Sequence, residues 1–215
     1  MKRTFLFLSF LFFSFFHLQG QTDSKPEFTA GLKAGLNLSN LNQGQSNDGR
    51  YSSIASYHAG AFLNLKGRYF GFQPELIYSR QGGIFSNSIY PINVDTRYDY
   101  LNVPLMVKFY AFWGIYLQAG PQFGYLLSAR KTTTEDPNGP NNLPNVITFV
   151  NGSIKSSQAQ TDLSGSFGIG CDLPHGFTFD ARYNIGFVNV SSEHGSIRNK
   201  TGMFSIGYKF VRPGK

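Results

Sequence analysis

The stretch Phe28-Thr-Ala-Gly-Leu-Lys-Ala-Gly-Leu-Asn-Leu-Ser39 alternates apolar and polar residues at every second position. In an extended strand successive side chains point to opposite faces, so its apolar residues share one face, and Lys33 and Asn37 share the other. A strand that is apolar outside and polar inside is typical of barrels that cross a membrane. The stretch therefore predicts a strand with lipid on one side and a polar interior on the other.

The first 20 residues have the features of a secretory signal peptide. Lys2 and Arg3 give a positive start, an apolar Phe-rich run extends from Thr4 to Leu18, and Gly20 is a small residue suited to cleavage. The apolar run is shorter than the ~20 residues that a spanning helix needs. We expect residues 1–20 to be removed on export and residues 21–27 to form a short polar segment.

Composition and charge favour a membrane barrel over a nucleic-acid-binding protein. Aromatic residues make up 16% of the chain and charged residues only 14%, and there are 24 glycines. The formal net charge is +7, or +5 without Lys2 and Arg3, but the basic residues form no run or aromatic platform. We expect anionic lipid headgroups rather than nucleic acid as the counter-charge. The single cysteine, Cys171, falls on an apolar face, where it is expected to act as a small hydrophobe.

The period-two pattern recurs along the whole chain. Eight strands are predicted, at about 28–39, 55–65, 69–81, 98–110, 115–128, 161–172, 177–190 and 201–210. Long polar loops are predicted near 40–54, 82–97, 129–160 and 191–200, and short turns near 66–68, 111–114 and 173–176.

Strict alternation of long loops with short turns is a property of outer-membrane barrels, whose loops are extracellular and whose turns are periplasmic. We therefore expect an all-β fold, an eight-stranded antiparallel up-and-down transmembrane barrel over residues 28–210, with a tail at 211–215. Both termini should be periplasmic. Pro74, Pro104 and Pro121 fall inside predicted strands, where each removes a ladder donor, so bulges or rim positions are expected there.

The inward register collects charged side chains. Eight strands enclose an interior just wide enough for side chains to fill, and charges enclosed there must be paired or hydrated. Two interpretations remain open: a structural salt-bridge network that plugs the interior, and a narrow polar conduit or ligand cup. The residues expected in this interior polar network are Lys33, His58, Glu75, Lys108, Asp180, Arg182 and Lys209.

No motif for a cofactor, a metal or catalysis is evident. His58, His175 and His194 lack metal-ligand spacing, and Gly168-Ile-Gly170 lacks the strand-to-helix context of a dinucleotide site. We therefore expect no cofactor and no enzyme activity. One alternative is a lipid-modifying enzyme, which would need a Ser–His–acid cluster such as Ser79, His58 and Glu75.

Four segments of the chain resemble a known family, and the resemblance covers nearly all of the sequence after residue 20. They are Ala34-Gly-Leu-Asn-Leu-Ser-Asn-Leu41, Gly71-Phe-Gln-Pro-Glu-Leu-Ile-Tyr-Ser-Arg-Gln-Gly82, Tyr100-Leu-Asn-Val-Pro-Leu-Met-Val-Lys108 and Leu117-Gln-Ala-Gly-Pro-Gln-Phe-Gly124. The segments are similar to those of small Bacteroidetes outer-membrane barrels labelled PorT-like or "outer membrane protein beta-barrel domain" proteins, in which in-strand prolines are common.

The resemblance implies the fold and leaves the role open, since one member type takes part in protein secretion. The aromatic end of the last strand, Tyr208 and Phe210, resembles the signal read by the barrel-assembly machinery. Here five residues, Val211-Arg-Pro-Gly-Lys215, follow that aromatic end.

Taken together, these patterns predict a non-enzymatic integral outer-membrane barrel of a Gram-negative bacterium with a structural, surface-interaction or secretion-assisting role. A narrow porin-like conduit for small solutes is the first alternative, and a lipid-modifying enzyme is the second. The expected partners are outer-membrane lipid, the assembly machinery and a protein bound through the loops or turns. One candidate loop segment for such binding is Asp136-Pro-Asn-Gly-Pro-Asn-Asn142.

Overall fold

The computed structural model describes residues 27–43, 49–87, 92–135, 148–153, 160–187 and 197–211. The expected signal peptide at 1–20, the segment at 21–26, the loop segment 136–142 and tail residues 212–215 lie outside this part of the chain.

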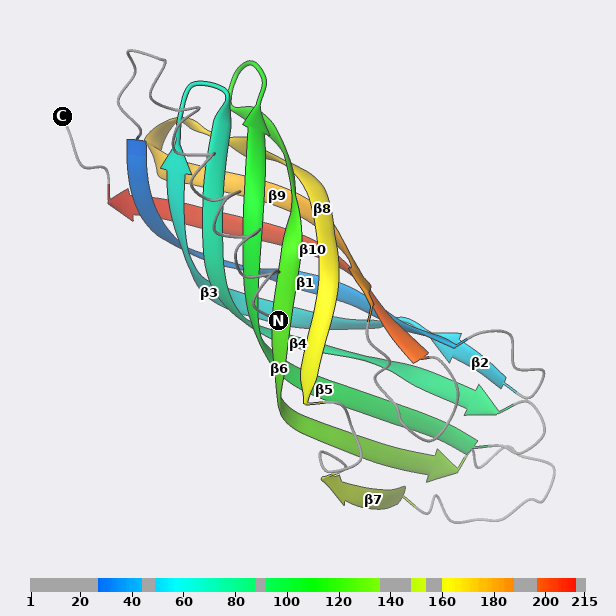
Figure 1. The fold of residues 1–215 in the computed structure, drawn as a ribbon. Helices are drawn as coiled ribbons and strands as arrows, with labels where there is room; N and C mark the ends of the chain where they lie inside the picture. Colours follow the sequence, from blue (N-terminus) through cyan, green and yellow to red (C-terminus); the bar gives the residue numbers. More distant parts are fainter. Residues whose placement is uncertain are drawn as a thin grey trace, which may run out of the picture.

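The described residues are almost entirely β-strand (Figure 1). The strands are β1 Glu27–Gln43, β2 Gly49–Ser52, β3 Ile54–Lys66, β4 Phe70–Asn87, β5 Ile92–Tyr110, β6 Ile115–Glu135, β7 Thr148–Ser153, β8 Thr161–Asp172, β9 Phe177–Gly186 and β10 Ile197–Val211. A short 3-10 turn, η2, covers Pro174–Gly176.

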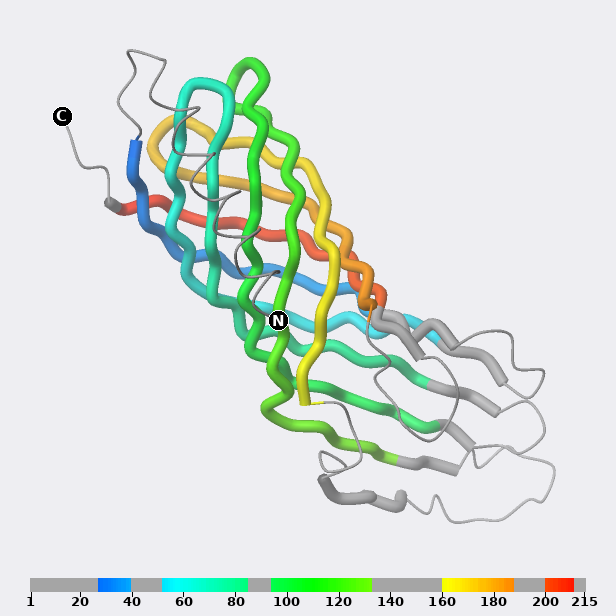
Figure 2. The backbone as a smooth tube through the Cα atoms, in the orientation of Figure 1, coloured from blue at the N-terminus to red at the C-terminus, as the bar shows by residue number. Residues whose placement is uncertain are grey.

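Eight of these strands close into an antiparallel barrel. Each pairs with its neighbours in chain order, and β1 pairs with both β3 and β10, so the first and last strands complete the ring (Figure 2). The two short strands extend the sheet: β2 pairs with β4, and β7 pairs with β6. The predicted eight-stranded up-and-down barrel is confirmed.

The two faces of the wall differ in polarity as the period-two pattern predicts. Along β1, Leu32, Leu36 and Leu38 are exposed on the outside, while Lys33 and Asn37 are buried inside. Among the described residues thirty large hydrophobic side chains are exposed, most of them on the strands, which suits contact with hydrocarbon. Among the residues that the structure describes, no helix is long and apolar enough to span a membrane.

The inner face alternates large and small side chains. Phe62, which interrupts the polar series of β3, is buried opposite Gly31, where an added Cβ would lie 2.5 Å from the Phe62 ring. The ring of Tyr116 lies against Gly170 in the same way, at 2.4 Å from an added Cβ. Such large–small pairing fills a small barrel with side chains.

The three predicted short turns are confirmed, and they lie at the same end of the barrel as the start of β1 and the end of β10 (Figure 1). We call this the turn end and the opposite rim the loop end. Positive φ values at Trp113, Gly114, His175 and Gly176 allow the chain to reverse in two of these turns.

All four predicted long loops were too long, because strands continue into them; β10, for example, begins at Ile197 rather than at the predicted 201. Strands β4 and β5 remain paired from Phe70 opposite Phe109 to Ser86 opposite Asn93, so most of 82–97 is a hairpin. Similarly, β6 continues to Glu135, and β1 to Gln43. Cross-strand hydrogen bonds join the backbones whatever the side chains are. Beyond the lipid the outward side chains need not be apolar, so these segments lack the period-two pattern that predicts a strand. In the other direction, β9 ends at Gly186, short of the predicted 190, and 188–190 lie outside the described residues.

The in-strand prolines lie next to interruptions in the ladder rather than at register shifts. Pro74 pairs with Leu105, but the next recorded β4–β5 pair is Ile77 with Asn102. Pro104 pairs with Gln122, and the β5–β6 ladder resumes at Val107. The expected bulge or rim positions were therefore wrong for these two residues. The interruptions accommodate residues that cannot donate to the ladder.

Candidate functional site: a charged cluster across the lumen

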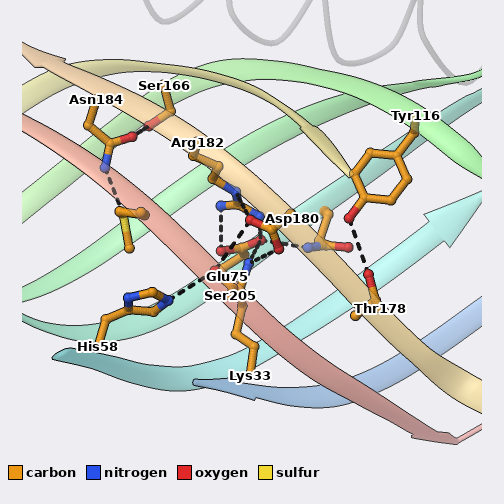
Figure 3. A network of polar contacts seen from close by, with 12 residues as sticks. Lys33, His58, Glu75, Tyr116, Ser166, Thr178, Asp180, Arg182, Asn184 and Ser205 are labelled. Atoms are coloured by element: carbon orange, nitrogen blue, oxygen red, sulfur yellow. Dashed lines mark hydrogen bonds and ion pairs between the residues drawn. The ribbon is translucent and has the colours of Figure 1, made fainter. Parts of the chain in front are cut away.

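Four charged side chains meet inside the barrel (Figure 3). Lys33 on β1 places its Nζ 2.8 Å from Asp180 Oδ2 and 3.5 Å from Glu75 Oε1. Arg182 on β9 binds Glu75 on β4 through two nitrogens, with Nη1 2.8 Å from Oε2 and Nη2 2.5 Å from Oε1. Its Nε lies 2.8 Å from Asp180 Oδ1. Two cations and two anions from three non-adjacent parts of the wall thus join across the lumen.

The four-residue cluster is enclosed and balanced in charge. At most 3% of any of the four side chains is accessible. Removing an ion from water costs several kcal/mol, so enclosed ions need close partners with good geometry. The forked contact of Arg182 with Glu75 provides such geometry. A further bond from Gln73 Nε2 to Glu75 Oε1, at 2.5 Å, adds to the bonds of that carboxylate.

His58 lies beside this cluster and joins a serine to an asparagine. Its Nε2 is 2.9 Å from Ser205 Oγ, and its Nδ1 is 2.7 Å from Asn37 Oδ1. Ser205 Oγ also lies 3.4 Å from Asp180 Oδ1, which connects the histidine to the cluster. One imidazole nitrogen therefore contacts a serine hydroxyl, and the other contacts an amide oxygen. In serine hydrolases the base makes similar contacts with its nucleophile and with the residue that orients it.

Lys108 and Lys209 lie apart from the cluster. Lys108 is fully buried with its Nζ 3.8 Å from the centre of the Tyr116 ring, a cation–π contact. Within the described residues it forms no ion pair. Lys209 forms an ion pair with Asp172 near the turn end.

On the loop-end side, aromatic and aliphatic side chains from three neighbouring strands are buried in the lumen. Tyr98 is paired with Ala129, and Tyr100 with Leu126, and all four are at least 95% buried. The Tyr98 and Tyr100 rings are 6.2 Å apart, and Ile77 of β4 is also buried.

A polar pocket of about 630 Å³ opens at the turn end. Glu27, Lys66, Trp113, Asp172 and Lys209 are among the residues that line it. Asn64 Oδ1 and Asp172 Oδ1 are buried there without a hydrogen-bond partner in the part of the chain described. Buried polar atoms of this kind are commonly satisfied by water, so the pocket is suited to hydration.

All seven residues expected in the interior polar network are buried inside the barrel. Five of them lie together, namely Lys33, His58, Glu75, Asp180 and Arg182. The expected neighbour of His58, Ser79, bonds instead to Asn37 and Gln81, at 3.0 and 3.2 Å. Ser79 is the cross-strand partner of His58, as expected, but the hydrogen-bond partners of the imidazole are Ser205 and Asn37. The inward register already put both residues inside, but nothing in the sequence indicated that they would meet His58.

Tyr208 and Phe210, the residues of the expected assembly signal, lie on the outer face near the end of β10. The Tyr208 ring packs against Phe177 of β9, with centroids 5.2 Å apart. Among the described residues, no group of three or more His, Cys, Asp or Glu side chains is arranged to hold a metal ion.

Residues 19–192 match the family model described as "Outer membrane protein beta-barrel domain". The chain belongs to this family. It is therefore an integral outer-membrane protein of a Gram-negative bacterium. No curated protein matches the chain in sequence.

Solved structures that are similar to this chain include three outer-membrane proteins of low sequence identity. Neisserial surface protein A is 12% identical over 84% of this chain and 97% of its own, with a TM-score of 0.50. The attachment invasion locus protein Ail of Yersinia pestis is 14% identical over 87% and 100%, with a TM-score of 0.49. OprG from Pseudomonas aeruginosa is 12% identical over 86% and 95%, with a TM-score of 0.38. At these identities the likeness concerns the fold alone.

We expect replacement of Arg182 by Gln to lower the free energy of unfolding by about 3–5 kcal/mol, because it leaves buried carboxylates without their partner. The measurement is a urea titration of the barrel refolded in neutral detergent micelles. The matched control is Arg97→Gln, which breaks the exposed Arg97–Asp95 pair and should cost at most about 1 kcal/mol.

Adding Glu75→Gln to Arg182→Gln removes one anion with one cation and restores the charge balance. The double variant should therefore lose less stability than the sum of the two single variants. An Arg182→Gln variant as stable as the Arg97→Gln control would show that the cluster does not hold the barrel together.

Proposed function

We propose that this protein is a non-enzymatic outer-membrane barrel that does not conduct solutes, and that its role lies in membrane structure or in interactions at its surface. The observation that carries the proposal is the charged cluster that joins Lys33, Glu75, Asp180 and Arg182 across the lumen. In this proposal the interior polar network is structural: it fills the barrel and ties β1, β4 and β9 together.

The apolar layer supports the same proposal. Tyr98, Tyr100 and Leu126 are buried on the loop-end side of the lumen, so a solute would have to displace aromatic rings as well as ion pairs. Eight-stranded barrels are in general just wide enough for side chains to fill. A filled lumen leaves the outer wall and the two rims as the surfaces available for function.

The turn-end pocket favours a second candidate, a narrow conduit for small solutes. Its charged rim, which includes Lys66 and Lys209, would admit water and ions from the periplasm. Such a conduit would require the charged cluster to separate during transport.

Single-channel recording in a planar bilayer distinguishes the two functions. We expect no conductance steps from the wild-type barrel, because ion pairs and aromatic rings cross its lumen. A Glu75→Ala, Arg182→Ala variant serves as the comparator, since it removes two crossing side chains. Regular conductance steps from the wild-type protein would favour the conduit. Conductance steps from the double variant alone would show that the ion pairs close the lumen.

An enzyme is the remaining alternative, and the Ser205–His58–Asn37 contacts are the arrangement that would serve it. A hydrolase also needs its substrate to reach the nucleophile. Ser205 is 6% exposed, His58 1% and Asn37 0%, and the charged cluster lies beside them. We therefore assign these three residues to the structural network.

A fluorophosphonate probe, which labels activated serines, tests this assignment. We expect no labelling of the folded barrel in vesicles, with Ser205→Ala as the matched control. Labelling of the wild-type protein that disappears in Ser205→Ala would assign a nucleophile to this position and contradict the non-enzymatic proposal.

The finer family assignment also belongs to this proposal. The four sequence segments resembling PorT-like barrels of Bacteroidetes suggest an interaction or secretion-assisting role, with a protein partner bound through loops or turns. In the same proposal, Tyr208 and Phe210 form the signal for the barrel-assembly machinery. Their outward position near the end of β10 suits recognition by another protein.

We expect a tagged barrel, extracted in mild detergent from its own outer membrane, to retain a stoichiometric protein partner. Mass spectrometry of the eluate provides the readout, and a tagged unrelated barrel of similar size provides the background. Recovery of lipid alone would remove the partner-binding part of the proposal and leave a structural barrel.

A further inference from the structure

The outer face of β4, β5 and β6 changes from apolar to charged within three successive cross-strand rows. The pairing of these strands continues from the lipid-facing wall toward the loop end, and a register shift between Tyr100 and Asp99 leaves Leu127 of β6 as an extra residue between the first two rows. In order, the rows are Tyr78–Leu101–Tyr125, Arg80–Asp99–Ser128 and Gly82–Arg97–Arg130. Three arginines therefore stand directly beyond the apolar wall, and we call Arg80, Arg97 and Arg130 the arginine row.

Arg80 is anchored at the edge of the apolar wall. Its Nε lies 2.7 Å from Asp99 Oδ1, and its guanidinium lies 5.3 Å from the centre of the Tyr57 ring. The Tyr78 hydroxyl donates to the same carboxylate at 2.8 Å. Tyrosines and arginines that share contacts in this way are typical of the boundary between hydrocarbon and headgroups.

Arg97 and Arg130 occupy directly opposed positions on β5 and β6, and both are exposed. Like charges opposite each other destabilise a sheet unless a counter-charge lies between them. Arg97 has one carboxylate partner, Asp95 on its own strand, with Nη2 2.8 Å from Oδ2. Arg130 forms no ion pair within the described residues, so the row carries three cations against two anions.

We propose that the arginine row binds the phosphate groups of lipid A in the outer leaflet. The row lies on the side wall of the barrel rather than on a loop tip, at the level where hydrocarbon gives way to headgroups. The loop end of an outer-membrane barrel is extracellular, where that leaflet is found. The guanidinium fork matches phosphate oxygens, and an anion placed between Arg97 and Arg130 would satisfy both. This binding is independent of whether the lumen conducts.

Binding of a fluorescent lipid A to the barrel in neutral detergent micelles tests the proposal. An Arg97→Gln, Arg130→Gln variant should bind about 30-fold more weakly, since each basic residue near an anionic lipid surface contributes about one kcal/mol, a factor of about five. Replacement of both by Lys should recover part of the affinity, because the charge remains but the fork is lost. The matched control is Arg68→Gln, an exposed arginine at the turn end, which should bind like the wild type.

Two further binding experiments identify which part of the ligand is recognised. Lipid A without its phosphates should bind the wild-type barrel as weakly as the Gln variant binds intact lipid A. Millimolar inorganic phosphate should not displace intact lipid A, whose acyl chains also contact the wall. Heat-modifiable migration on gels confirms that each variant is folded. Equal binding by the wild-type and Gln-variant barrels, equal binding of dephosphorylated lipid A, or displacement by free phosphate would each overturn the proposal.

Discussion

The hydrogen bonding of the backbone in hydrocarbon is the constraint on which the rest of this structure depends. Inside a bilayer each N–H and C=O group needs a protein partner, and a sheet meets that requirement only when it has no edge. Pairing of β1 with β10 removes the edge. Closure then dictates the period-two pattern, with apolar side chains on the lipid side and the remaining side chains buried in a narrow lumen.

The narrow lumen makes charge pairing a second requirement. Lys33, Glu75, Asp180 and Arg182 are withdrawn from water, and two cations against two anions leave no net charge in the cluster. The Ser205–His58–Asn37 contacts extend the same network. Its contacts are similar to those of a catalytic triad, but the three side chains are buried, and the proposed function assigns them to the structural network. An arrangement of donors and acceptors therefore indicates an enzyme only when a substrate can reach it.

The outer face at the loop end differs from both the wall and the lumen. Strands β4, β5 and β6 extend at the loop end (Figure 1). Beyond the apolar wall they carry charged residues, including the opposed Arg97 and Arg130. Charges inside the barrel satisfy one another, whereas this row has more cations than anions among the residues described. The surface available to other molecules is thus the outside of the barrel and its rims.

The sequence by itself determined the eight strands, their inward and outward faces and the three short turns, because a side-chain period of two and turn-forming residues are local properties. It missed the continuation of β4, β5 and β6, because strands beyond the lipid lose the apolar alternation while their backbones remain paired. Only the tertiary structure decided which inward residues meet. Lys33 and Asp180 are 147 positions apart, and His58 hydrogen-bonds to Ser205 rather than to its cross-strand partner Ser79. Such contacts depend on the stagger of all eight strands around the closed ring, which no single strand's pattern contains.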